Sequence, residues 1–515
     1  MKNPIYYIGI LTCGLALSSC SSDYLTVSSD ASQSTGVIFS TTDNVKLAVN
    51  GLAKMMTQQY MKTQHYNGEG TIKTFYGNVQ GNDYQRQYTS FSAIAKMQHL
   101  VNAESIYDYY PWYYYYRIIS NANTIIMEVD NAAGSTAEKE FLKAQALTYR
   151  AYCYSMLVQL YSKRWCDSNG GQTRGVVLRV DESKGDLPLS TLGKCYEQIY
   201  ADLDNAIRLF SESGRDRGQG VNYLPNLNAA YAVYARAAIN REDWQTAAHY
   251  AQLARQGYPL MTNEEYMSGF NTANREWIWS VYSDESESLE YFQFFAYEGS
   301  NSNSTMCRLR PASISKELYE QIPATDLRRN LFLNPQTDAY NTATGVAGSA
   351  LAARARQTFG SRLYSTSQIF AYMQFKNMAK ALPGVGELNL FRSSEMYLIQ
   401  AEADCHLEGK ESEARQLLVE LNRTSGRDPE YTCDKTGADL LNEVRLYNRI
   451  ELWGEGHDWF NYKRWRLPIV RHTAAQGGSI LTAFAGTIQP DDYDGWTWVI
   501  PQKETDYNSD ILGTE

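Results

Sequence analysis

Residues 225–259, PNLNAAYAVYARAAINREDWQTAAHYAQLARQGYP, carry the clearest information on the fold. Pro225 and Pro259 bound this segment about 34 positions apart, which is the period of the tetratricopeptide helix pair. Alanine recurs in both halves, where two antiparallel helices have to approach each other closely, and Tyr234 and Trp244 lie among the alanines. The segment therefore predicts two paired helices, at residues 228–240 and 244–256.

Apolar residues recur at helical spacing in several other parts of the chain. The first such segment opens with Thr42 and Asp43, which are suitable capping residues. The predicted helices outside the repeat unit are 42–61, 111–129, 138–161, 192–210, 392–407, 411–421 and 438–452. Several are adjacent and joined by short turns, so the sequence predicts a mainly α-helical protein built from helix pairs.

The composition changes between residues 257 and 386, where Gly, Asn, Ser and Thr dominate and aromatic residues are scattered. Inserts of this length are uncommon in compact proteins unless they carry function, because loops can vary on a rigid support. Short strands are predicted at residues 277–282, 372–376 and 496–500. We therefore expect helical repeats at residues 43–257 and 392–465, a loop-rich ligand lobe at 258–391 and a C-terminal segment at 466–515, all in one body.

The N-terminal residues have the pattern of an export signal. Lys2 precedes an apolar stretch, residues 5–17, which is shorter than the roughly 20 residues needed to span a bilayer. Leu17-Ser18-Ser19-Cys20 resembles a bacterial lipobox, in which the cysteine is lipidated and becomes the first mature residue. Two or more acyl chains give stable anchoring, at about 0.8 kcal/mol per buried methylene. We therefore expect a lipoprotein signal peptide at residues 1–19 and a lipidated flexible tether at 20–42.

Charge and cysteine content exclude several classes of function. The formal net charge of -10 argues against a nucleic-acid partner. The cysteines beyond Cys20 have no C-x-x-C spacing, so neither a metal centre nor a cofactor is expected. Disulfides and simple burial remain alternatives for Cys153, Cys166, Cys195, Cys307, Cys405 and Cys433. The acidic residues 491–495 suggest a calcium loop, but Pro490 stands at the first ligand position, so a turn is expected.

A late block, residues 449–465 (RIELWGEGHDWFNYKRW), resembles the Glu-Leu, Glu-Gly and Arg-Trp block of the SusD/RagB family of outer-membrane lipoproteins. Two positions depart from the family pattern, because His457 stands where arginine is usual and Asn461 where aspartate is usual. These changes remove a potential ion pair but leave the aromatic packing. Further segments that resemble the family, in the same order along the chain, are 116–123, 144–152, 223–226, 276–281, 392–403 and 414–427.

This resemblance implies four tetratricopeptide-type helix pairs with a loop-rich lobe that contains a few short strands. It also implies docking against a SusC-like TonB-dependent transporter in the outer membrane, without catalysis or a cofactor. The expected function is cell-surface capture of oligosaccharide or polysaccharide and its delivery to that transporter. Capture of oligopeptides by the same architecture, as in RagB, is the alternative.

Aromatic side chains are the first candidates for sugar contacts, because flat apolar rings pack against sugar rings. Tyrosine is the commonest aromatic residue, with 40 copies, and residues 107–116 form the densest cluster. If Pro111 lies in the first helical turn, Trp112 and Tyr116 could form a platform beside the buried face. Packing against neighbouring repeats is an equal alternative. The resemblance implies ligand contacts at this helix start and in the preceding loop, namely at Asp83, Tyr84, Arg86, Trp112, Tyr115 and Tyr116.

A second aromatic cluster lies in the loop-rich region, where family members often supply further ring contacts. Tyr291, Phe295 and Tyr297 are its candidate ligand residues, and a local hydrophobic patch is the alternative. Arg308 and Arg310 follow in the sequence. Either arginine could instead meet a peptide carboxylate or an acidic sugar in a bidentate contact.

Two other classes of function compete with ligand capture. A glycoside hydrolase with a helical fold is possible, because any two of the many carboxylates could form a catalytic pair. The chain has no H-E-x-x-H, G-x-S-x-G or phosphate-loop motif, and a structural role is expected for His457. A scaffold that binds only proteins is the third possibility, since tetratricopeptide arrays often do so.

Overall fold

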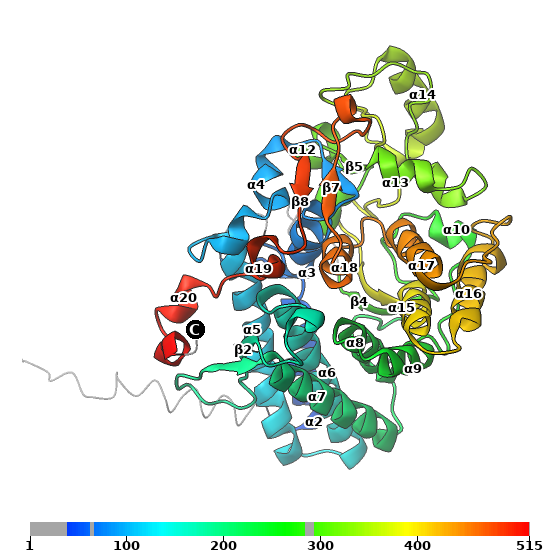
Figure 1. The fold of residues 1–515 in the computed structure, drawn as a ribbon. Helices are drawn as coiled ribbons and strands as arrows, with labels where there is room; N and C mark the ends of the chain where they lie inside the picture. The colour runs from blue at the N-terminus through cyan, green and yellow to red at the C-terminus, as the bar shows by residue number, and fades with distance from the viewer. Residues whose placement is uncertain (1–38, 62–65, 284–292, 514–515) are drawn as a thin grey trace, which may run out of the picture.

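A computed structural model describes residues 39–61, 66–283 and 293–513, and Cys20 and Tyr291 lie outside these ranges. The described chain is mainly helical, with a few short strands (Figure 1). None of its helices is long and apolar enough to cross a membrane. The longer helices are α2 (Thr42–Met55), α5 (Ile106–Glu128), α6 (Thr136–Tyr161), α7 (Leu192–Ser213), α8 (Leu227–Asn240), α9 (Trp244–Ala254), α14 (Ser349–Phe359), α15 (Ser393–His406), α16 (Glu411–Val419), α17 (Gly437–Glu451) and α18 (Asp458–Trp465).

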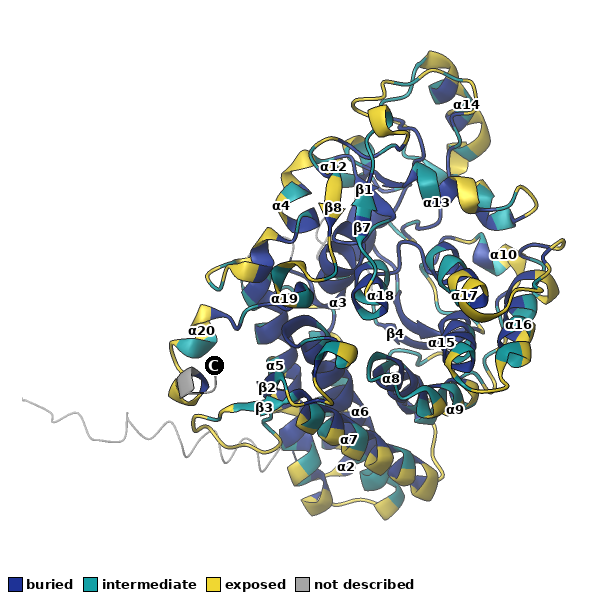
Figure 2. Cartoon of the chain, viewed as in Figure 1, coloured by how far each residue is buried: buried dark blue, intermediate teal, exposed yellow. Residues whose placement is uncertain are grey.

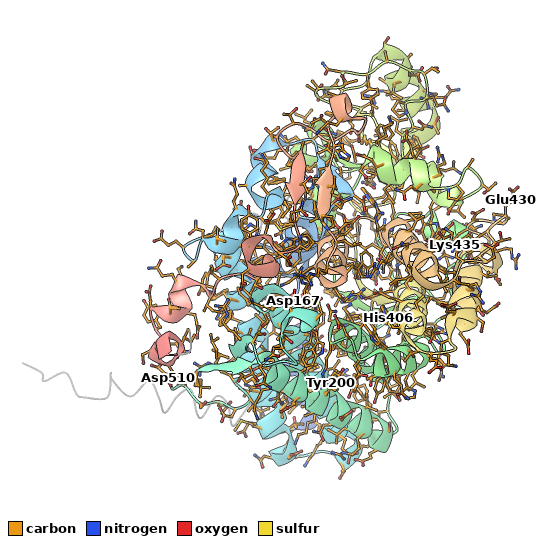
Figure 3. All side chains as sticks on the ribbon, viewed as in Figure 1. Asp167, Tyr200, His406, Glu430, Lys435 and Asp510 are labelled. Atoms are coloured by element: carbon orange, nitrogen blue, oxygen red, sulfur yellow. The ribbon has the colours of Figure 1, made fainter. Side chains whose placement is uncertain are left out.

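The predicted repeat unit is present as the antiparallel pair α8 and α9. Neighbouring helices pack in succession, α5 on α6, α6 on α7, α7 on α8, and α9 on α15, which also contacts α16 and α17 (Figure 1). Tyr234 and Tyr250 stack between α8 and α9, with ring centroids 4.0 Å apart. At the end of α15, His406 stacks on Trp244 of α9 at the same centroid distance (Figure 3). The prediction of a helix-pair scaffold is confirmed.

Helix α5 begins earlier than its sequence pattern predicts. Ser105 caps it by accepting a hydrogen bond from the Tyr107 N–H at 3.2 Å, so Pro111 lies inside the helix and not in its first turn. Proline lacks an N–H, which leaves the carbonyl four residues earlier without its helical partner. That carbonyl, of Tyr107, accepts a hydrogen bond from the Tyr76 hydroxyl at 2.8 Å. A side chain from another segment therefore allows α5 to continue through the proline.

A second tyrosine enters the same turn of α5. The Tyr161 hydroxyl, at the end of α6, accepts a hydrogen bond from the Trp112 N–H at 3.2 Å and donates one to the Asp108 carbonyl. It thus replaces a direct helical bond between these two backbone groups. The shift in helix start from residue 111 to 106 changes which residues of the tyrosine-rich cluster face solvent.

The strands form four antiparallel pairs in the described residues. They are β1 (Tyr84–Arg86) with β5 (Ala312–Ile314), β2 (Arg174–Val177) with β3 (Leu189–Thr191), β4 (Trp277–Val281) with β6 (Leu388–Arg392), and β7 (Ile469–Arg471) with β8 (Gly486–Ile488). The strand predicted at 277–282 is therefore confirmed as β4. Residues 372–376 form only isolated bridges, and 496–500 form no strand, because Trp498 and Val499 donate to carbonyls of two separate segments.

The loop-rich region, at the top of Figure 1, contains short helices and the exposed α14. Its short helices include α11 (Phe294–Glu298), α12 (Thr305–Leu309) and α13 (Lys316–Gln321). The middle of α6 is buried, whereas α7 and α14 expose much of their outer surface (Figure 2). The C-terminal segment adds α19 (Asp492–Trp496) and α20 (Gln502–Thr505), and α20 lies near the start of α5.

A buried network of charged side chains joins this region to the helices. Arg392, at the end of β6, pairs with Glu276 at 2.8 Å, Glu451 at 2.7 Å and Glu455 at 2.8 Å. Arg328, from the loop-rich region, also reaches Glu451 at 2.7 Å. All five side chains are at most 6% exposed, so their charges are satisfied within the protein.

The block at residues 449–465 contains a turn that requires two glycines. Gly454 and Gly456 both have positive φ, of 75° and 85°. The turn lies against a buried π-helical segment, Ile72–Val79, where Lys73 donates to the Glu455 carbonyl at 2.7 Å. A Cβ on Gly77 would lie 2.2 Å from the Gly456 carbonyl oxygen, so both segments of the chain need glycine at this contact.

Candidate functional site

Trp112 and Tyr115 on α5 lie inside the protein, whereas Tyr116 is half-buried. Trp112 is 2% exposed, its Nε1 donates to Glu504 at 3.1 Å, and its ring packs edge-on against Tyr161. Tyr115 is fully buried, and the Tyr116 hydroxyl donates to the Val177 carbonyl at 2.6 Å. Trp112 is therefore closed to solvent and Tyr116 is only partly open, so the two rings offer no open platform, and the alternative of packing between helices fits the geometry.

The three candidates before α5 are also buried. Asp83 accepts two hydrogen bonds from the Arg449 guanidinium, at 2.6 and 2.8 Å. Tyr84 donates to Glu298 at 2.8 Å, and Arg86 forms an ion pair with the same carboxylate at 2.9 Å. These contacts anchor β1 to the elements around it, and the three side chains have no exposed surface to offer a ligand.

The described candidates of the second aromatic cluster lie on α11. Phe295 is 1% exposed and Tyr297 is 6% exposed, and both belong to the main core. The Tyr297 carbonyl accepts a hydrogen bond from Arg86 at 2.6 Å, which links this cluster to β1. Direct contact of these residues with a ligand remains a prediction, and so does contact by the candidates on β1 and α5. Their burial does not favour it.

A series of aromatic rings leads from this core to the surface. Phe75 lies at its centre, with its ring centroid 6.1 Å from those of Tyr297 and Tyr107 and 5.2 Å from that of Phe91. Phe91 in turn meets Tyr88 edge-on, at 5.1 Å. Tyr297, Phe75 and Phe91 are buried, whereas Tyr88 and Tyr107 are partly exposed. The two outer tyrosines are therefore held from behind by fixed rings.

An arginine covers one face of the outermost ring. The Arg310 guanidinium carbon lies 3.7 Å from the centroid of Tyr88, and its side chain is partly exposed. A hydrogen bond with Ser90 and the charge of Arg310 lower the pKa of the Tyr88 hydroxyl. We call Tyr88, Tyr107 and Arg310 the Tyr88 surface. It combines a cation and a tyrosine edge with the partly exposed ring of Tyr107, whose pKa is raised by burial and by the nearby Tyr88, and this set suits a polar ligand with flat faces.

The sequence predicts Arg310 as a candidate ligand contact, and it predicts contacts within the aromatic cluster that contains Tyr107. It does not predict Tyr88 or Tyr107 as ligand residues. The position of Tyr107 depends on the true start of α5, and a capping serine at residue 105 was the available signal. Tyr88 follows the short strand β1, and no local pattern distinguishes it. Only its contacts with Phe91 and Arg310 identify it.

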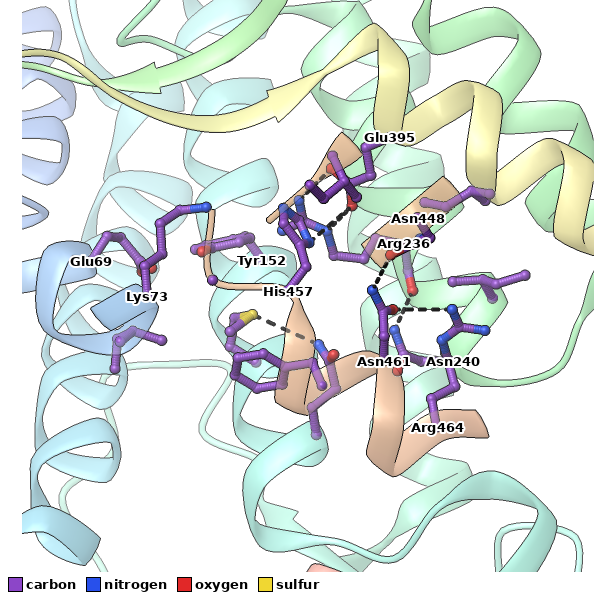
Figure 4. Close-up of a pocket in the computed structure, with 18 residues that line it drawn as sticks. Glu69, Lys73, Tyr152, Arg236, Asn240, Glu395, Asn448, His457, Asn461 and Arg464 are labelled. Carbon is purple, nitrogen blue, oxygen red and sulfur yellow. Dashed lines mark hydrogen bonds and ion pairs between the residues drawn. The ribbon is translucent and has the colours of Figure 1, made fainter. Parts of the chain in front are cut away.

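A second site is a polar pocket between α6, α8, α15 and α18, with a cavity volume of about 40 Å³. Figure 4 shows Glu69 and Lys73 at one end and Asn240 and Arg464 at the other. Glu395, which is also buried, accepts two hydrogen bonds from Arg236, both at 2.6 Å. The cavity thus contains carboxylates and cations that are largely paired with each other.

Burial raises the pKa of Glu69 in this cavity to about 7. A carboxylic acid of raised pKa and a second carboxylate are the groups that glycosidases use. Both carboxylates here are engaged by protein, since Glu69 accepts hydrogen bonds from Tyr114 and Tyr115 and Glu395 from Arg236. The cavity is therefore the place to test for hydrolysis, and its contacts favour a structural role.

His457, at the departure from the family pattern, lies in the same cavity. Its Nδ1 is 4.0 Å from Glu395, beyond hydrogen-bond distance. Burial and the charges of Lys73 and Arg236 hold the pKa of His457 well below its usual value. The imidazole is therefore neutral at physiological pH, consistent with the structural role expected for it.

The described residues contain no group of three or more His, Cys, Asp or Glu side chains that could hold a metal ion. All six described cysteines are free thiols in this structure. The sequence predicts a turn at residues 491–495, and the structure has the short helix α19 there, in which Tyr493, Asp494 and Gly495 have left-handed backbone angles. Asp491 and Asp494 pair with Arg164 and Lys163.

The fold and the Tyr88 surface together define a class: a helix-pair scaffold with a loop-rich region that presents tyrosine and arginine at the surface. Two family models match the sequence, one described as starch-binding associating with outer membrane over residues 23–239, and one described as SusD family over residues 276–511. The chain belongs to the SusD/RagB family. Among curated proteins, none matches the sequence.

Solved structures share this fold over almost their whole length. A SusD-like carbohydrate binding protein from Bacteroides vulgatus has a TM-score of 0.75 and 20% identity, covering 93% of this chain and 98% of that one. A SusD superfamily protein from Bacteroides thetaiotaomicron has a TM-score of 0.72 and 22% identity, covering 92% and 99%. At sequence identities of 20–22%, the similarity to these structures establishes the fold of this chain.

Proposed function

We propose that this chain is a lipid-anchored protein at the cell surface that captures oligosaccharide or polysaccharide and delivers it to a SusC-like TonB-dependent transporter. The Tyr88 surface is the observation that carries this proposal. It combines a partly exposed ring at Tyr107 with hydrogen-bonding groups on Tyr88 and Arg310, as sites for sugars require. The family match, with its starch-binding description, supports the same class of ligand.

The rigidity of the surrounding structure also supports this site. Phe75 and Phe91 fix the outer rings, and the ion pair between Arg86 and Glu298 fixes β1 behind them. A site that is ordered before binding loses less conformational entropy when the ligand arrives. The earlier candidates Tyr84, Arg86 and Tyr297 therefore act as supports of the surface.

Membrane anchoring rests on the lipobox, with Cys20 as the lipidated residue. The tether is shorter than the predicted residues 20–42, because Phe39 is already buried and α2 begins at Thr42, and it would let the folded part reach a transporter in the same membrane. Fractionation tests the anchor: Cys20→Ala should move the protein from the membrane fraction to the soluble fraction. Retention of this variant in the membrane would contradict lipid anchoring. Co-purification with a defined SusC-like transporter, expressed with this chain, tests the partner.

Ligand capture is tested with purified residues 21–515 and a panel of polysaccharides and oligopeptides, by affinity electrophoresis and calorimetry. Tyr88→Ala removes the ring under Arg310 and should weaken glycan binding about five-fold or more, since a ring contact of this kind is worth on the order of 1 kcal/mol or more. Tyr507→Ala is the matched control, because Tyr507 is 84% exposed and lies on a different element.

The same experiment separates the competing functions. Binding without released sugar, weakened by Tyr88→Ala alone, supports glycan capture. Binding only to peptides supports the RagB-like alternative. Released sugar that disappears in Glu69→Gln would establish a hydrolase in the internal cavity and overturn the proposal.

A further inference from the structure

Arg310 is fixed in place before any ligand binds. It follows α12, its backbone N–H donates to the Met306 carbonyl at 3.2 Å, and its own carbonyl accepts a hydrogen bond from Arg86 at 3.3 Å. Its guanidinium lies over the Tyr88 ring at 3.7 Å. Both the backbone and the side chain of Arg310 are therefore held by neighbours.

The positive charge of Arg310 has no carboxylate partner among the described residues. Each carboxylate in that part of the chain lies beyond ion-pair distance of its guanidinium, in contrast to Arg86, directly below, which pairs with Glu298 at 2.9 Å. Arg308, two residues earlier, also lacks a carboxylate, but it donates to the Asn303 carbonyl at 2.9 Å and the Thr366 hydroxyl at 3.0 Å. Arg310 thus differs from Arg86, which has a carboxylate partner, and from Arg308, whose side chain donates hydrogen bonds to neutral groups. It lacks a carboxylate partner although the protein carries an overall negative charge.

The Arg310 side chain is partly exposed, and the Tyr88 hydroxyl takes one hydrogen bond from it. A guanidinium has five N–H donors, so donors remain available for a ligand. A planar fork of N–H donors matches a carboxylate, and a bidentate ion pair of this kind strengthens binding about ten-fold or more. A neutral sugar hydroxyl would accept weaker hydrogen bonds from the same N–H donors.

We propose that the ligand of the Tyr88 surface is an oligosaccharide that carries carboxylate groups, such as one containing uronic acid, and that Arg310 receives a carboxylate as a bidentate ion pair. Tyr88 orients the guanidinium from below, and Tyr107 contacts the adjacent sugar. This inference rests on the proposed function and specifies its class of substrate.

The test compares acidic oligosaccharides with their neutral methyl esters, because esterification removes the charge and keeps the sugar backbone. Oligogalacturonate, glucuronoxylan and alginate oligosaccharides, each with its methyl ester, are titrated calorimetrically into residues 21–515. We expect at least one acid to bind about ten-fold or more tightly than its ester. Arg310→Gln should reduce this preference to about two-fold or less, and Arg310→Lys should restore only part of it, because lysine lacks the fork.

Arg308→Gln is the matched control, since it removes the same charge two residues earlier, within α12, and should keep the preference. Thermal unfolding of each variant verifies that it is folded. Equal binding of acid and ester, or a preference that survives Arg310→Gln, would overturn the inference. If the inference about carboxylates is overturned in this way but Tyr88→Ala abolishes binding of neutral glycans, the proposed capture function still stands. Failure of every glycan to bind would overturn both.

Discussion

His99 is a buried imidazole enclosed by aromatic rings. Its ring centroid lies 4.7 Å from that of Trp498 and 5.9 Å from that of Tyr76, and neither ring nitrogen has a hydrogen-bond partner in the structure as described. Burial lowers the pKa of His99 to about 3. The side chain is therefore neutral in the folded protein and behaves as one more aromatic ring of the core.

This environment predicts a specific loss of stability in acid. The unfolded-state pKa of histidine is about 6.5, so the unfolded chain binds more protons than the folded one between about pH 6.5 and pH 3. The contribution of neutral His99 to stability is complete above this window and is lost as the pH falls through it. At pH 5 the loss is about 2 kcal/mol relative to pH 7.

His99→Phe should therefore reduce the difference in unfolding free energy between pH 7 and pH 5 by about 2 kcal/mol, measured by denaturant titration. The control is His249→Phe, because His249 is exposed. An unchanged pH dependence in His99→Phe would show that this imidazole is not the group that titrates.

At the scale of the element, α5 depends on two tyrosine hydroxyls from other segments. Tyr76 satisfies the carbonyl that Pro111 leaves free, and Tyr161 bridges the Trp112 N–H and the Asp108 carbonyl. A buried backbone group without a partner costs about 1–3 kcal/mol. The helix is therefore stable through its proline only because the tertiary structure supplies these two hydroxyls.

Tyr161→Phe removes both contacts of one hydroxyl and should lower the free energy of unfolding by about 2 kcal/mol or more. Tyr76→Phe removes a single hydrogen bond and should cost about half as much. Urea denaturation measures both values. A loss below about 0.5 kcal/mol in Tyr161→Phe would mean that the Trp112 N–H and the Asp108 carbonyl close on each other directly.

At the scale of the whole molecule, buried ion pairs connect the loop-rich region with the helices. Nearby arginines and Lys376 hold the pKa of Glu451 well below its usual value, against the effect of burial, and Arg392 and Lys376 lower that of Glu455 to about 2. Because these folded-state pKa values are depressed, the network contributes full stability above about pH 4.5 and loses it as the pH falls toward 2. This window begins about two pH units below that of His99 and overlaps it between about pH 4.5 and pH 3.

Glu451→Gln leaves Arg392 and Arg328 each without one of their carboxylate partners, so it should destabilise the protein by about 3 kcal/mol or more. Glu443→Gln, on the same helix, removes a more exposed ion pair with Lys435 and should cost less than about 1 kcal/mol. Thermal and denaturant unfolding measure the difference. Similar losses in the two variants would mean that the buried network adds no more than a surface pair.

The sequence alone determined the helices closely, because helical periodicity and capping residues are local. Residues 192–210, 228–240, 244–256 and 438–452 became α7, α8, α9 and α17 with ends shifted by at most three residues. The start of α5 differed more, since the proline signal was stronger locally than the capping serine that the structure uses. The family also followed from sequence, because its late block is long.

Which aromatic rings face solvent was decided only by the tertiary structure. Trp112 and Tyr88 are both plausible sugar contacts by residue type, but Trp112 is covered by Tyr161 and Glu504 from distant segments, whereas Tyr88 ends a ring series and supports Arg310. Burial depends on which remote elements pack on a residue, and local periodicity carries no information on that choice. The scaffold was therefore readable from the sequence, and the position of the binding surface required the fold.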